Sequence, residues 1–292
     1  MAPYVSVVVP TCGRPDLLKR CLAALERQSL ARHAYEIIVV EDAKREGPAT
    51  ARNRGWRQAR ASIVAFTDDD CVPERSWLAA GLTAMARGYD AVTGRIVMPL
   101  SGRPTDYERD AQQLQASEFV TANCFVRRAT LERMGGFDER FRLAWREDSD
   151  LHFSLLRGGA RIGRAPGSVV VHPVRPAGWG VSLKQQRKVM FDALLFKKHP
   201  RLYRERIRAT PRWDYYAIVL SLLMALLLPY PAGAAALALW FVLSLKFFLA
   251  RVRGTSAKPL HVTEVLFTSF AIPPIAVFWR IVGALRFRVA FS

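Results

Sequence analysis

The stretch that most constrains the fold of this chain is an apolar run, Ile63-Val-Ala-Phe66, that leads through Thr67 into three consecutive carboxylates. Its β-branched residues predict a short buried strand. Asp68, Asp69 and Asp70 then repel one another unless a cation or N–H donors lie between them. Alternation along an extended strand end puts Asp68 and Asp70 on one side and Asp69 on the other. This pattern favours a site for Mg²⁺ or Mn²⁺, which prefer oxygen ligands; a solvated acidic turn, or a helix cap by Asp70, is the alternative.

Similar apolar runs recur before and after this one, and helical patterns separate them. They predict strands over residues 5–10, 36–40 and 90–96, and helices over residues 17–28, 47–60 and 74–87. Such an alternation predicts a parallel sheet covered by helices on both faces. Ligands bind sheets of this kind at the carboxyl ends of the strands. Three of these ends carry polar side chains, which are Thr11 and Arg14, Glu41 and Asp42, and Asp68 to Asp70.

A second series of shorter elements begins near residue 99. Residues 99–115 indicate a polar loop, residues 119–126 a strand and residues 128–134 a short helix. A helix beginning at Trp145 carries Glu147 and Asp148 in its first turn, where acidic side chains also complement the helix macrodipole. Two further short strands, over residues 160–162 and 168–171, lead to His172.

The chain is strongly basic, with a formal charge of +18, and residues 184–212 hold ten Lys and Arg against two acidic residues. Apolar residues at helical spacing interrupt this charge. The pattern predicts a basic amphipathic helix on an anionic membrane surface, and nucleic acid is the rival partner. Four cysteines without zinc-binding spacing predict free thiols in a reducing compartment, and we expect no signal peptide.

Two apolar runs, residues 215–230 and 232–250, approach the roughly 20 residues that span a bilayer. Both flanks are basic, so the positive-inside rule predicts a transmembrane hairpin with both flanks in the cytoplasm. Two buried helices of a soluble bundle are the alternative. Residues 262–285 have a short apolar core and contain Pro273-Pro274, which predicts a re-entrant or interfacial pair of short helices, or a third membrane segment. The expected domains are a sheet domain over 1–180, an interfacial segment over 181–212, a hairpin over 213–250 and a last segment over 251–292.

Seven short stretches follow one another between about residues 4 and 172. They are Val5-Ser-Val-Val-Val-Pro-Thr11, Glu36-Ile-Ile-Val-Val-Glu-Asp42, Ala51-Arg-Asn-Arg-Gly55, Phe66-Thr-Asp-Asp-Asp70, Thr121-Ala-Asn-Cys-Phe-Val-Arg127, Gly135-Gly-Phe-Asp-Glu139 and Arg146-Glu-Asp-Ser-Asp-Leu151. In this order they resemble the inverting family-2 glycosyltransferases. The resemblance implies a GT-A type, Rossmann-like mixed sheet flanked by helices, an α/β fold, followed by a C-terminal membrane-associated helical region.

The resemblance also implies which residues bind the nucleotide of a sugar donor. Those that match the family's motifs are Thr11, Arg14, Asp42, Arg52, Asn53 and Asp68. Asp42 accepts from the base, Arg52 and Asn53 approach from the start of their helix, and Asp68 contacts the ribose or the metal.

The same resemblance implies a metal site and a catalytic base. Asp70 ligates Mg²⁺ or Mn²⁺, with Asp68 beside it, and His172 completes the site in some members; otherwise His172 is a surface histidine at a strand end. Asp148 matches the base that deprotonates the acceptor hydroxyl. Residues expected to contact the acceptor or the sugar are Asn123, Glu147 and Trp145.

The implied activity is inverting, metal-dependent transfer from a nucleoside diphosphate sugar of the UDP, GDP or dTDP type. The expected acceptor is a lipid or is lipid-linked, in cell-envelope glycan or glycolipid synthesis. The expected location is the plasma (inner) membrane, with several spans and a cytoplasmic catalytic domain. The segment Gln185-Gln-Arg-Lys-Val189 lacks the Gln-x-x-Arg-Trp motif of the family's processive synthases, which predicts one transfer per acceptor.

Other classes of function remain open at this point. A nucleotidyltransferase would carry a Gly-rich basic loop after the first strand, whereas Thr11-Cys-Gly-Arg-Pro15 has one glycine. A catalytically silent membrane scaffold, or a basic nucleic-acid-binding protein, would not need Asp68, Asp70 and Asp148 together. We expect no nucleic-acid partner. Specificity resides in loops, here residues 99–115 and 173–180, and residue types alone do not identify the sugar, the base or the acceptor.

Overall fold

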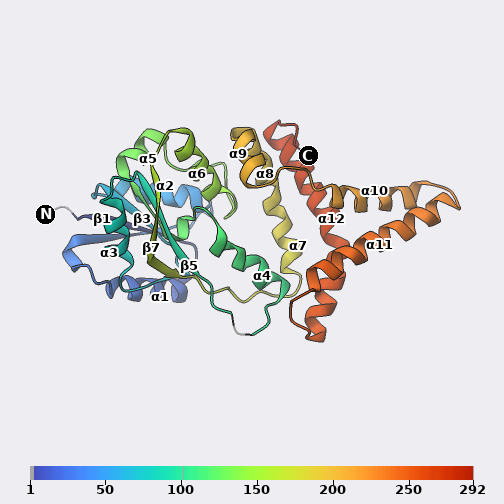
Figure 1. Cartoon of the computed structure of the whole chain (residues 1–292), viewed down its shortest axis with the longest axis horizontal. Coiled ribbons are helices and arrows are strands. Elements are labelled where there is room, and N and C mark those ends of the chain that lie inside the picture. Colours follow the sequence, from blue (N-terminus) through green and yellow to red (C-terminus); the bar gives the residue numbers. More distant parts are fainter. Residues whose placement is uncertain (1–2, 101, 292) are drawn as a thin grey trace. The chain divides into compact units, whose positions relative to one another are not determined.

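The computed structural model describes residues 3–100 and 102–291, and the chain divides into two compact units (Figure 1). The first, called the sheet unit here, consists of Met1–Pro99 and Gln112–Val174. The second, called the helical unit, consists of Leu100–Ala111 and Arg175–Ser292. The first part of the chain thus belongs to the sheet unit up to Val174, except that residues 100–111 belong to the helical unit.

The sheet unit is built on one mixed sheet, which has seven strands among the described residues, in the order β2-β1-β3-β6-β5-β7-β4. The strands are β1 (Val5–Thr11), β2 (Tyr35–Glu41), β3 (Ile63–Phe66), β4 (Val72–Pro73), β5 (Ala91–Val97), β6 (Cys124–Arg127) and β7 (Ile162–Val171). Val8, Phe66 and Val126 lie in its fully buried core.

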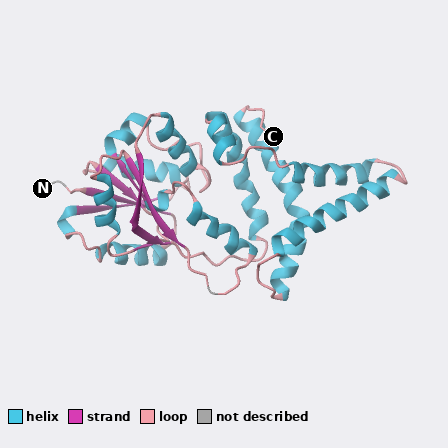
Figure 2. Ribbon diagram, viewed as in Figure 1, coloured by secondary structure: helices cyan, strands magenta, loops and turns pink. Residues whose placement is uncertain are grey.

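Helices flank this sheet (Figure 2). They are α1 (Pro15–Glu26), α2 (Pro48–Gln58), α3 (Trp77–Met85), α5 (Arg128–Met134) and α6 (Glu147–Arg157), with the 3-10 turns η1 (Arg32–Ala34), η2 (Gln113–Ala116) and η3 (Thr121–Asn123). Gly55 lets α2 approach the sheet, because a Cβ there would lie 2.3 Å from Val8 Cγ1. Close packing of α2 is what brings its polar residues to the end of β3.

The sheet is mixed, so the prediction of a purely parallel sheet is wrong. β1 pairs in parallel with β2 and β3, and β5 pairs in parallel with β7. In contrast, β6 runs antiparallel to both β3 and β5. After β5, the chain enters β6 at the same end of the sheet at which it left β5. β6 therefore runs antiparallel to β5. The GT-A type mixed sheet implied by the resemblance is confirmed.

Several element boundaries differ from the predicted ones. The strands expected over 160–162 and 168–171 form one strand, β7, whose pairing with β5 shifts between Gly94 and Arg95. The strand expected over 119–126 begins only at Cys124, because Thr121–Asn123 form a 3-10 turn. The two-residue strand β4 was not predicted; it pairs with the end of β7 directly after the carboxylates.

The helical unit contains the start of α4 (Asp106–Gln112) and the C-terminal helices. These are α7 (Val181–Gln185), η4 (Gln186–Val189), α8 (Met190–Lys198), α9 (Pro200–Arg206), α10 (Trp213–Leu227), α11 (Ala232–Val252) and α12 (Pro259–Phe287). The expected single amphipathic helix over 184–212 is therefore wrong. Its apolar side chains, such as Phe191 and Leu194, are buried inside the unit, where Gly283 of α12 allows close contact with the Met190 backbone.

The helix α12 is continuous, so the prediction of two short helices over residues 262–285 is also wrong. Pro273 and Pro274 lie within its 29 residues. Proline removes backbone hydrogen bonds from a helix, but packing against neighbouring helices compensates for the loss. Here Ile272 and Ala276 pack with Tyr215 of α10 in a buried cluster.

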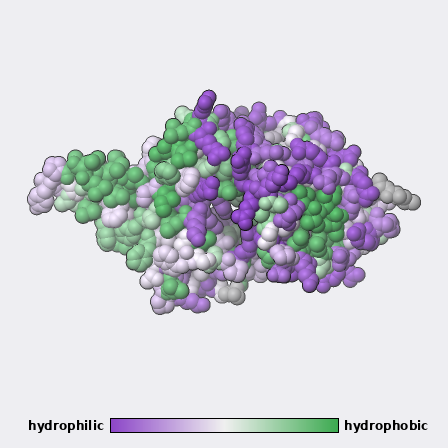
Figure 3. Space-filling view, turned by 180° about the vertical axis from the view of Figure 1, so that it is seen from behind, coloured by the Kyte–Doolittle hydropathy of each residue, from purple (hydrophilic) through white to green (hydrophobic). Residues whose placement is uncertain are grey.

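Apolar side chains cover much of the α10–α11 pair in the space-filling view (Figure 3). Exposed examples include Leu226, Leu227 and Val242. By length and composition, α11 and α12 are long and apolar enough to cross a membrane, whereas α10 has 15 residues. Two such helices weakly suggest membrane association.

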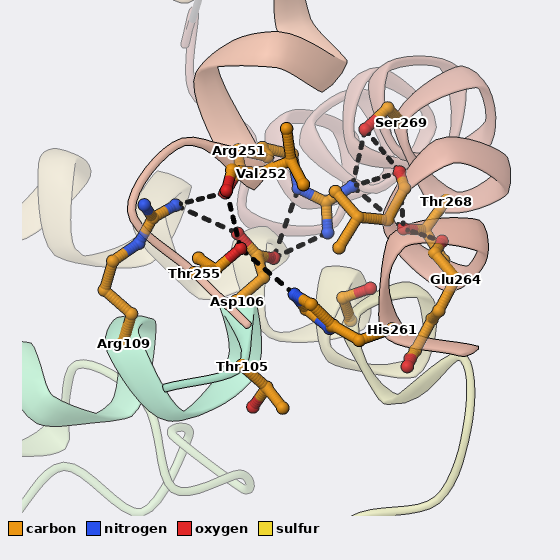
Figure 4. A network of polar contacts seen from close by, with 12 residues as sticks. Thr105, Asp106, Arg109, Arg251, Val252, Thr255, His261, Glu264, Thr268 and Ser269 are labelled. Carbon is orange, nitrogen blue, oxygen red and sulfur yellow. Dashed lines mark hydrogen bonds and ion pairs between the residues drawn. The ribbon is translucent and has the colours of Figure 1, made fainter. Parts of the chain in front are cut away.

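A polar network holds α4 against α11 and α12 (Figure 4). The Arg251 guanidinium, 9% exposed, donates to Asp106 Oδ2 at 2.7 Å and to the hydroxyls of Thr268 and Ser269, each at 2.9 Å. Arg109 donates to the backbone oxygen of Arg251 at 2.7 Å. These bonds explain why residues 100–111 fold with the helical unit, although the loop was expected to be part of the sheet domain.

Candidate active site

The carboxylates that follow β3 have different partners. Asp69 is fully buried and accepts from the Thr11 hydroxyl at 2.7 Å and from Arg14 Nε at 3.0 Å. Burial raises the pKa of Asp69, and the contacts with Thr11 and Arg14 offset only part of that rise. Thr11 is the last residue of β1 and Arg14 follows it, where the sequence predicts ligand binding. Both also contact Asp69 in the turn after β3.

Arg52 of α2 joins two parts of the site. It is 3% exposed and donates to Asp68 Oδ1 at 2.7 Å and to Glu147 Oε1 at 3.1 Å. These carboxylates come from different motifs, since Asp68 follows β3 and Glu147 begins α6. One guanidinium therefore links the acidic strand end to the acidic helix start.

The charges around Arg52 shift one another's pKa values. Burial alone would raise the pKa of Asp68, but Arg52 and His172 outweigh it and lower that pKa. Burial and the neighbouring Asp148 raise the pKa of Glu147 to about 7, although Arg52 acts against this rise. Burial would lower the pKa of Arg52, but Asp68, Asp148 and Glu147 together raise it. Arg52 is therefore a fixed cation among three carboxylates.

Asp148, the predicted base, is held by Thr121. The Thr121 hydroxyl donates to Asp148 Oδ1 at 2.5 Å, and the Thr121 backbone N–H donates to Oδ2 at 3.2 Å. Burial raises the pKa of Asp148, while Arg52 and Thr121 limit the rise. Such a carboxylate suits a general base, because its pKa is closer to neutral than that of an exposed aspartate.

Asp70 and His172 lie where a cation would fit. Ligand atoms of Asp70, Cys71 and His172 lie within 4.8 Å of one another, and His172 Nε2 is 3.7 Å from Asp70 Oδ1. Burial raises the pKa of Cys71 well above its usual value, which disfavours the thiolate form that binds metals. The carboxylate and the imidazole suit Mn²⁺, and oxygen ligands suit Mg²⁺. The residues present thus fit the expected ion.

Asp42 shapes the loop after β2. Its carboxylate accepts from the backbone N–H groups of Glu46 and Gly47, at 2.9 and 2.8 Å, and from Arg54 at 3.2 Å. With 5% of its surface exposed, Asp42 is buried in this loop. It stands beside Thr11, whose carbonyl accepts from the Asp42 backbone N–H at 2.8 Å.

Two predicted site residues have their polar atoms engaged inside the sheet unit. The Asn53 amide donates to the Phe137 carbonyl at 2.9 Å and accepts from the Phe137 N–H at 2.9 Å. Gly136 has φ +74°, and a Cβ there would lie 2.5 Å from Asn53 Oδ1. Asn123 accepts from Trp77 Nε1 and donates to the Ser168 carbonyl, both at 2.9 Å. This geometry favours supporting roles for Asn53 and Asn123 over direct ligand contacts.

Trp145 lies just before α6. The Arg146 guanidinium stacks 4.5 Å from its ring centroid, and Arg146 itself has φ +74° at the helix start. The indole is partly exposed, as a residue expected to contact an acceptor or a sugar must be.

Thr121 was missed as a functional residue by sequence reasoning. It opens the quoted stretch Thr121-Ala-Asn-Cys-Phe-Val-Arg127, but no local pattern indicates that it binds a carboxylate 27 residues away. The resemblance to the family drew attention to residues 121–127 as a whole. The contact between Thr121 and Asp148 is visible only in the tertiary structure.

A mixed α/β sheet with carboxylates grouped at one site is typical of nucleotide-sugar-dependent glycosyltransferases. Comparison with known proteins points to the same class of enzyme. The family model described as "Glycosyl transferase family group 2" matches residues 63–282. The chain belongs to this family and is a glycosyltransferase with a GT-A type fold.

Two similar proteins are glycosyltransferases as well. Glycosyltransferase AglE of Haloferax volcanii is 25% identical over an alignment of 248 positions, which covers 72% of this chain and 80% of that protein. The pre-mycofactocin glycosyltransferase of Mycobacterium tuberculosis is 33% identical over 59% of this chain. The chain covers 43% of that relative's length.

Solved structures share the fold. Mannosyltransferase PcManGT from Pyrobaculum calidifontis, in complex with GDP-Man and Mn²⁺, aligns with a TM-score of 0.58 and 22% identity. The alignment covers 96% of this chain and 88% of PcManGT. Residues 1–349 of S. aureus TarS, in complex with UDP-GlcNAc, align with a TM-score of 0.50 and 15% identity, covering 100% of this chain and 93% of that one.

Proposed function

We propose that the chain transfers one sugar at a time from a nucleoside diphosphate sugar to a hydroxyl group of a lipid or lipid-linked acceptor, with inversion at the anomeric carbon. The observation that carries this proposal is the position of Arg52, which contacts both Asp68 and Glu147. Asp68, which is expected to bind the donor, and Glu147, which precedes the proposed base Asp148, thus contact the same guanidinium. A transfer reaction needs these two groups close together, because donor and acceptor react within one site.

The donor would lie at the carboxyl ends of β1, β2 and β3. Thr11, Arg14 and Asp42 would face the nucleoside, and Asp68 the ribose or the metal. Arg14 remains partly exposed, with 32% of its side chain accessible, and can approach a phosphate. The complexes of PcManGT with GDP-Man and of TarS with UDP-GlcNAc support a nucleotide sugar as the donor class.

Two supporting residues would act through their neighbours. Asn53 would hold the turn at Phe137, and Asn123 would hold the sheet end beside η3. Neither needs to touch the donor to affect catalysis, because small displacements of reacting groups are costly.

Asp70 and His172, with Asp68 nearby, would hold Mn²⁺ or Mg²⁺. A bound divalent ion supplies Lewis-acid stabilisation of the charge that develops on the leaving diphosphate. The Mn²⁺ in the PcManGT complex supports this choice of ion. Glu147 and Trp145, close to Asp148 in the sequence, would contact the acceptor or the sugar.

Asp148 would accept the proton of the acceptor hydroxyl as that oxygen attacks the anomeric carbon from the face opposite the leaving group. A single displacement of this kind inverts the configuration. Thr121 would keep the Asp148 carboxylate oriented through both of its oxygens.

The helical unit supports a membrane-bound acceptor. Its exposed apolar side chains and two candidate spans would place the chain at the plasma (inner) membrane, as a multi-pass protein with the sheet unit in the cytoplasm. Nucleotide sugars are available there, and a lipid or lipid-linked acceptor would be presented at the same surface.

The test is calorimetric titration of the detergent-solubilised full chain with UDP, GDP and dTDP, each in Mn²⁺ and in EDTA. We expect one nucleotide to bind tightly and only with metal. Asp70→Ala should lose this binding, while Asp148→Asn should keep it and lose sugar transfer. Glu132→Ala, which removes an exposed carboxylate from the same unit, is the control. Absence of binding for all three nucleotides, or wild-type transfer by Asp148→Asn, would contradict the proposal.

A further inference from the structure

Arg280 is a buried cation for which the described residues provide no anionic partner. It lies in α12 with 4% of its surface exposed, and its Nη1 is enclosed. No hydrogen-bond acceptor for Nη1 is present among residues 3–100 and 102–291. A buried charge that is neither paired nor hydrogen-bonded is unfavourable, so a guanidinium of this kind calls for an explanation.

One neighbour of Arg280, Arg208, adds positive charge instead of neutralising it. The Arg280 guanidinium carbon lies 4.9 Å from the ring centroid of Phe291, a cation–π contact that compensates only in part. Arg208 is close enough that burial, Arg212 and Arg280 together lower its pKa. Arg212 has its own carboxylate, Asp214, at 2.6 Å. Within the described part of the chain, Arg208 and Arg280 form no ion pair.

A second buried arginine in the same unit shows what full compensation looks like. Arg251 is 9% exposed and has Asp106 at 2.7 Å and the hydroxyls of Thr268 and Ser269 at 2.9 Å (Figure 4). The described residues therefore satisfy the guanidinium of Arg251 but leave Nη1 of Arg280 without an acceptor. This difference indicates that a ligand from outside the chain completes the surroundings of Arg280.

We propose that Arg280 and Arg208 bind the phosphate group of an anionic membrane lipid. This inference rests on the membrane association proposed above, but it does not rest on sugar transfer. A phosphate offers several oxygen acceptors, and the guanidinium fork can donate to two of them at once.

Two features favour a lipid as the source of this phosphate. Arg208 and Arg212 directly precede α10, whose first residue, Trp213, is 64% exposed. Aromatic residues beside basic ones are typical of the membrane–water interface. Arg280 itself lies in a helix that is long and apolar enough to span a bilayer, where an ionisable side chain is by default a candidate functional group. Basic pockets between such helices bind lipid head groups.

The proposal is tested by thermal unfolding of the detergent-solubilised full chain titrated with dihexanoyl phosphatidic acid. The wild type should show a saturable rise in apparent Tm. Arg280→Met and Arg208→Met should each weaken the apparent affinity by roughly tenfold to hundredfold, the value of one charged hydrogen-bond pair. Arg286→Met removes the same charge from an exposed position of α12 and should keep wild-type affinity.

Different results of this titration distinguish the possible causes of a rise in apparent Tm. Wild-type lipid affinity in either Arg280→Met or Arg208→Met overturns the paired site. An equal rise in Tm with inorganic phosphate at the same concentration overturns the choice of a lipid. Metal-dependent nucleotide binding by Arg280→Met, measured in the same preparation, tests the transferase proposal separately, because that site lies in the sheet unit.

Discussion

Thr121 contacts both carboxylate oxygens of Asp148, one through its hydroxyl and the other through its backbone N–H. The two residues are 27 positions apart and stand at the starts of different elements, η3 and α6. Both bonds favour the ionised carboxylate, and they act against the burial that raises its pKa. Thr121 therefore sets the orientation of the proposed base and also the pH at which it works.

Replacement of Thr121 by valine removes the hydroxyl and leaves the backbone N–H in place. The ionised form of Asp148 loses a donor, so its pKa rises. The acidic limb of the pH profile of kcat/KM should move to higher pH by about one unit, as expected for a hydrogen bond to a charged group. Thr121→Ser keeps the donor and should restore the wild-type profile. A fall in kcat without movement of the limb would mean that Thr121 does not act through the ionisation of Asp148.

Arg52 should be essential for stability as well as for catalysis. Arg52→Met leaves Asp68, Glu147 and Asp148 close together without their cation. Arg52 and Glu147 form a buried pair, and loss of one partner of such a pair costs about 3–5 kcal/mol. Arg52→Lys retains the charge but not the planar fork that reaches Asp68 and Glu147 at once, so it should recover only part of the loss. Chemical denaturation measures both effects.

A matched control for Arg52 exists on the same helix. Arg57 of α2 is half exposed and lies 3.6 Å from the exposed Glu139. Surface pairs of this kind contribute little, roughly 0–1 kcal/mol. Equal destabilisation by Arg52→Met and Arg57→Met would show that Arg52 does not organise the site.

Local sequence patterns predicted the individual elements of the sheet unit well. The β-branched runs became β1, β2 and β3, and the helix expected over residues 128–134 has those bounds in the structure. β1 and most of β3 are buried, whereas β2 is an edge strand that leaves Val39 exposed. An apolar run carries no information on strand direction, however, so the antiparallel course of β6 was not predictable from it. The resemblance to a known family supplied the mixed sheet.

Contacts between residues far apart in the sequence could not be predicted, either in the site or in the loops. Asn53 and Asn123 lie in motifs, yet their amides satisfy backbone groups of segments far away in the sequence. The helix α12 continues through Pro273 because its neighbours pack there. Residues 100–111 look like a polar loop until the partner of Asp106, Arg251, is known. Each of these features depends on tertiary contacts that a local pattern does not contain.

His172 offers a test of the metal site that does not depend on sugar transfer. If His172 ligates the ion, His172→Asn should weaken Mn²⁺-dependent nucleotide binding by roughly tenfold or more, since even the partners of metal ligands matter to this degree. The loss should be larger for Mn²⁺ than for Mg²⁺, because the imidazole favours the former. Calorimetry with each ion measures it. His33→Asn, at an exposed position, should bind as the wild type does, and the same result for His172→Asn would exclude it as a ligand.

The buried pair of Asp106 and Arg251 should hold α4 to the helical unit. Asp106→Leu leaves the Arg251 guanidinium with hydroxyl partners but no counter-charge, so it should lower stability by about 3–5 kcal/mol. The double variant Asp106→Leu, Arg251→Met replaces the pair by apolar side chains and should recover most of the loss. Glu205→Gln breaks the exposed pair with Arg201 and should leave the apparent Tm unchanged. A double variant as unstable as Asp106→Leu alone would show that Asp106 stabilises the unit through contacts other than the charge of Arg251.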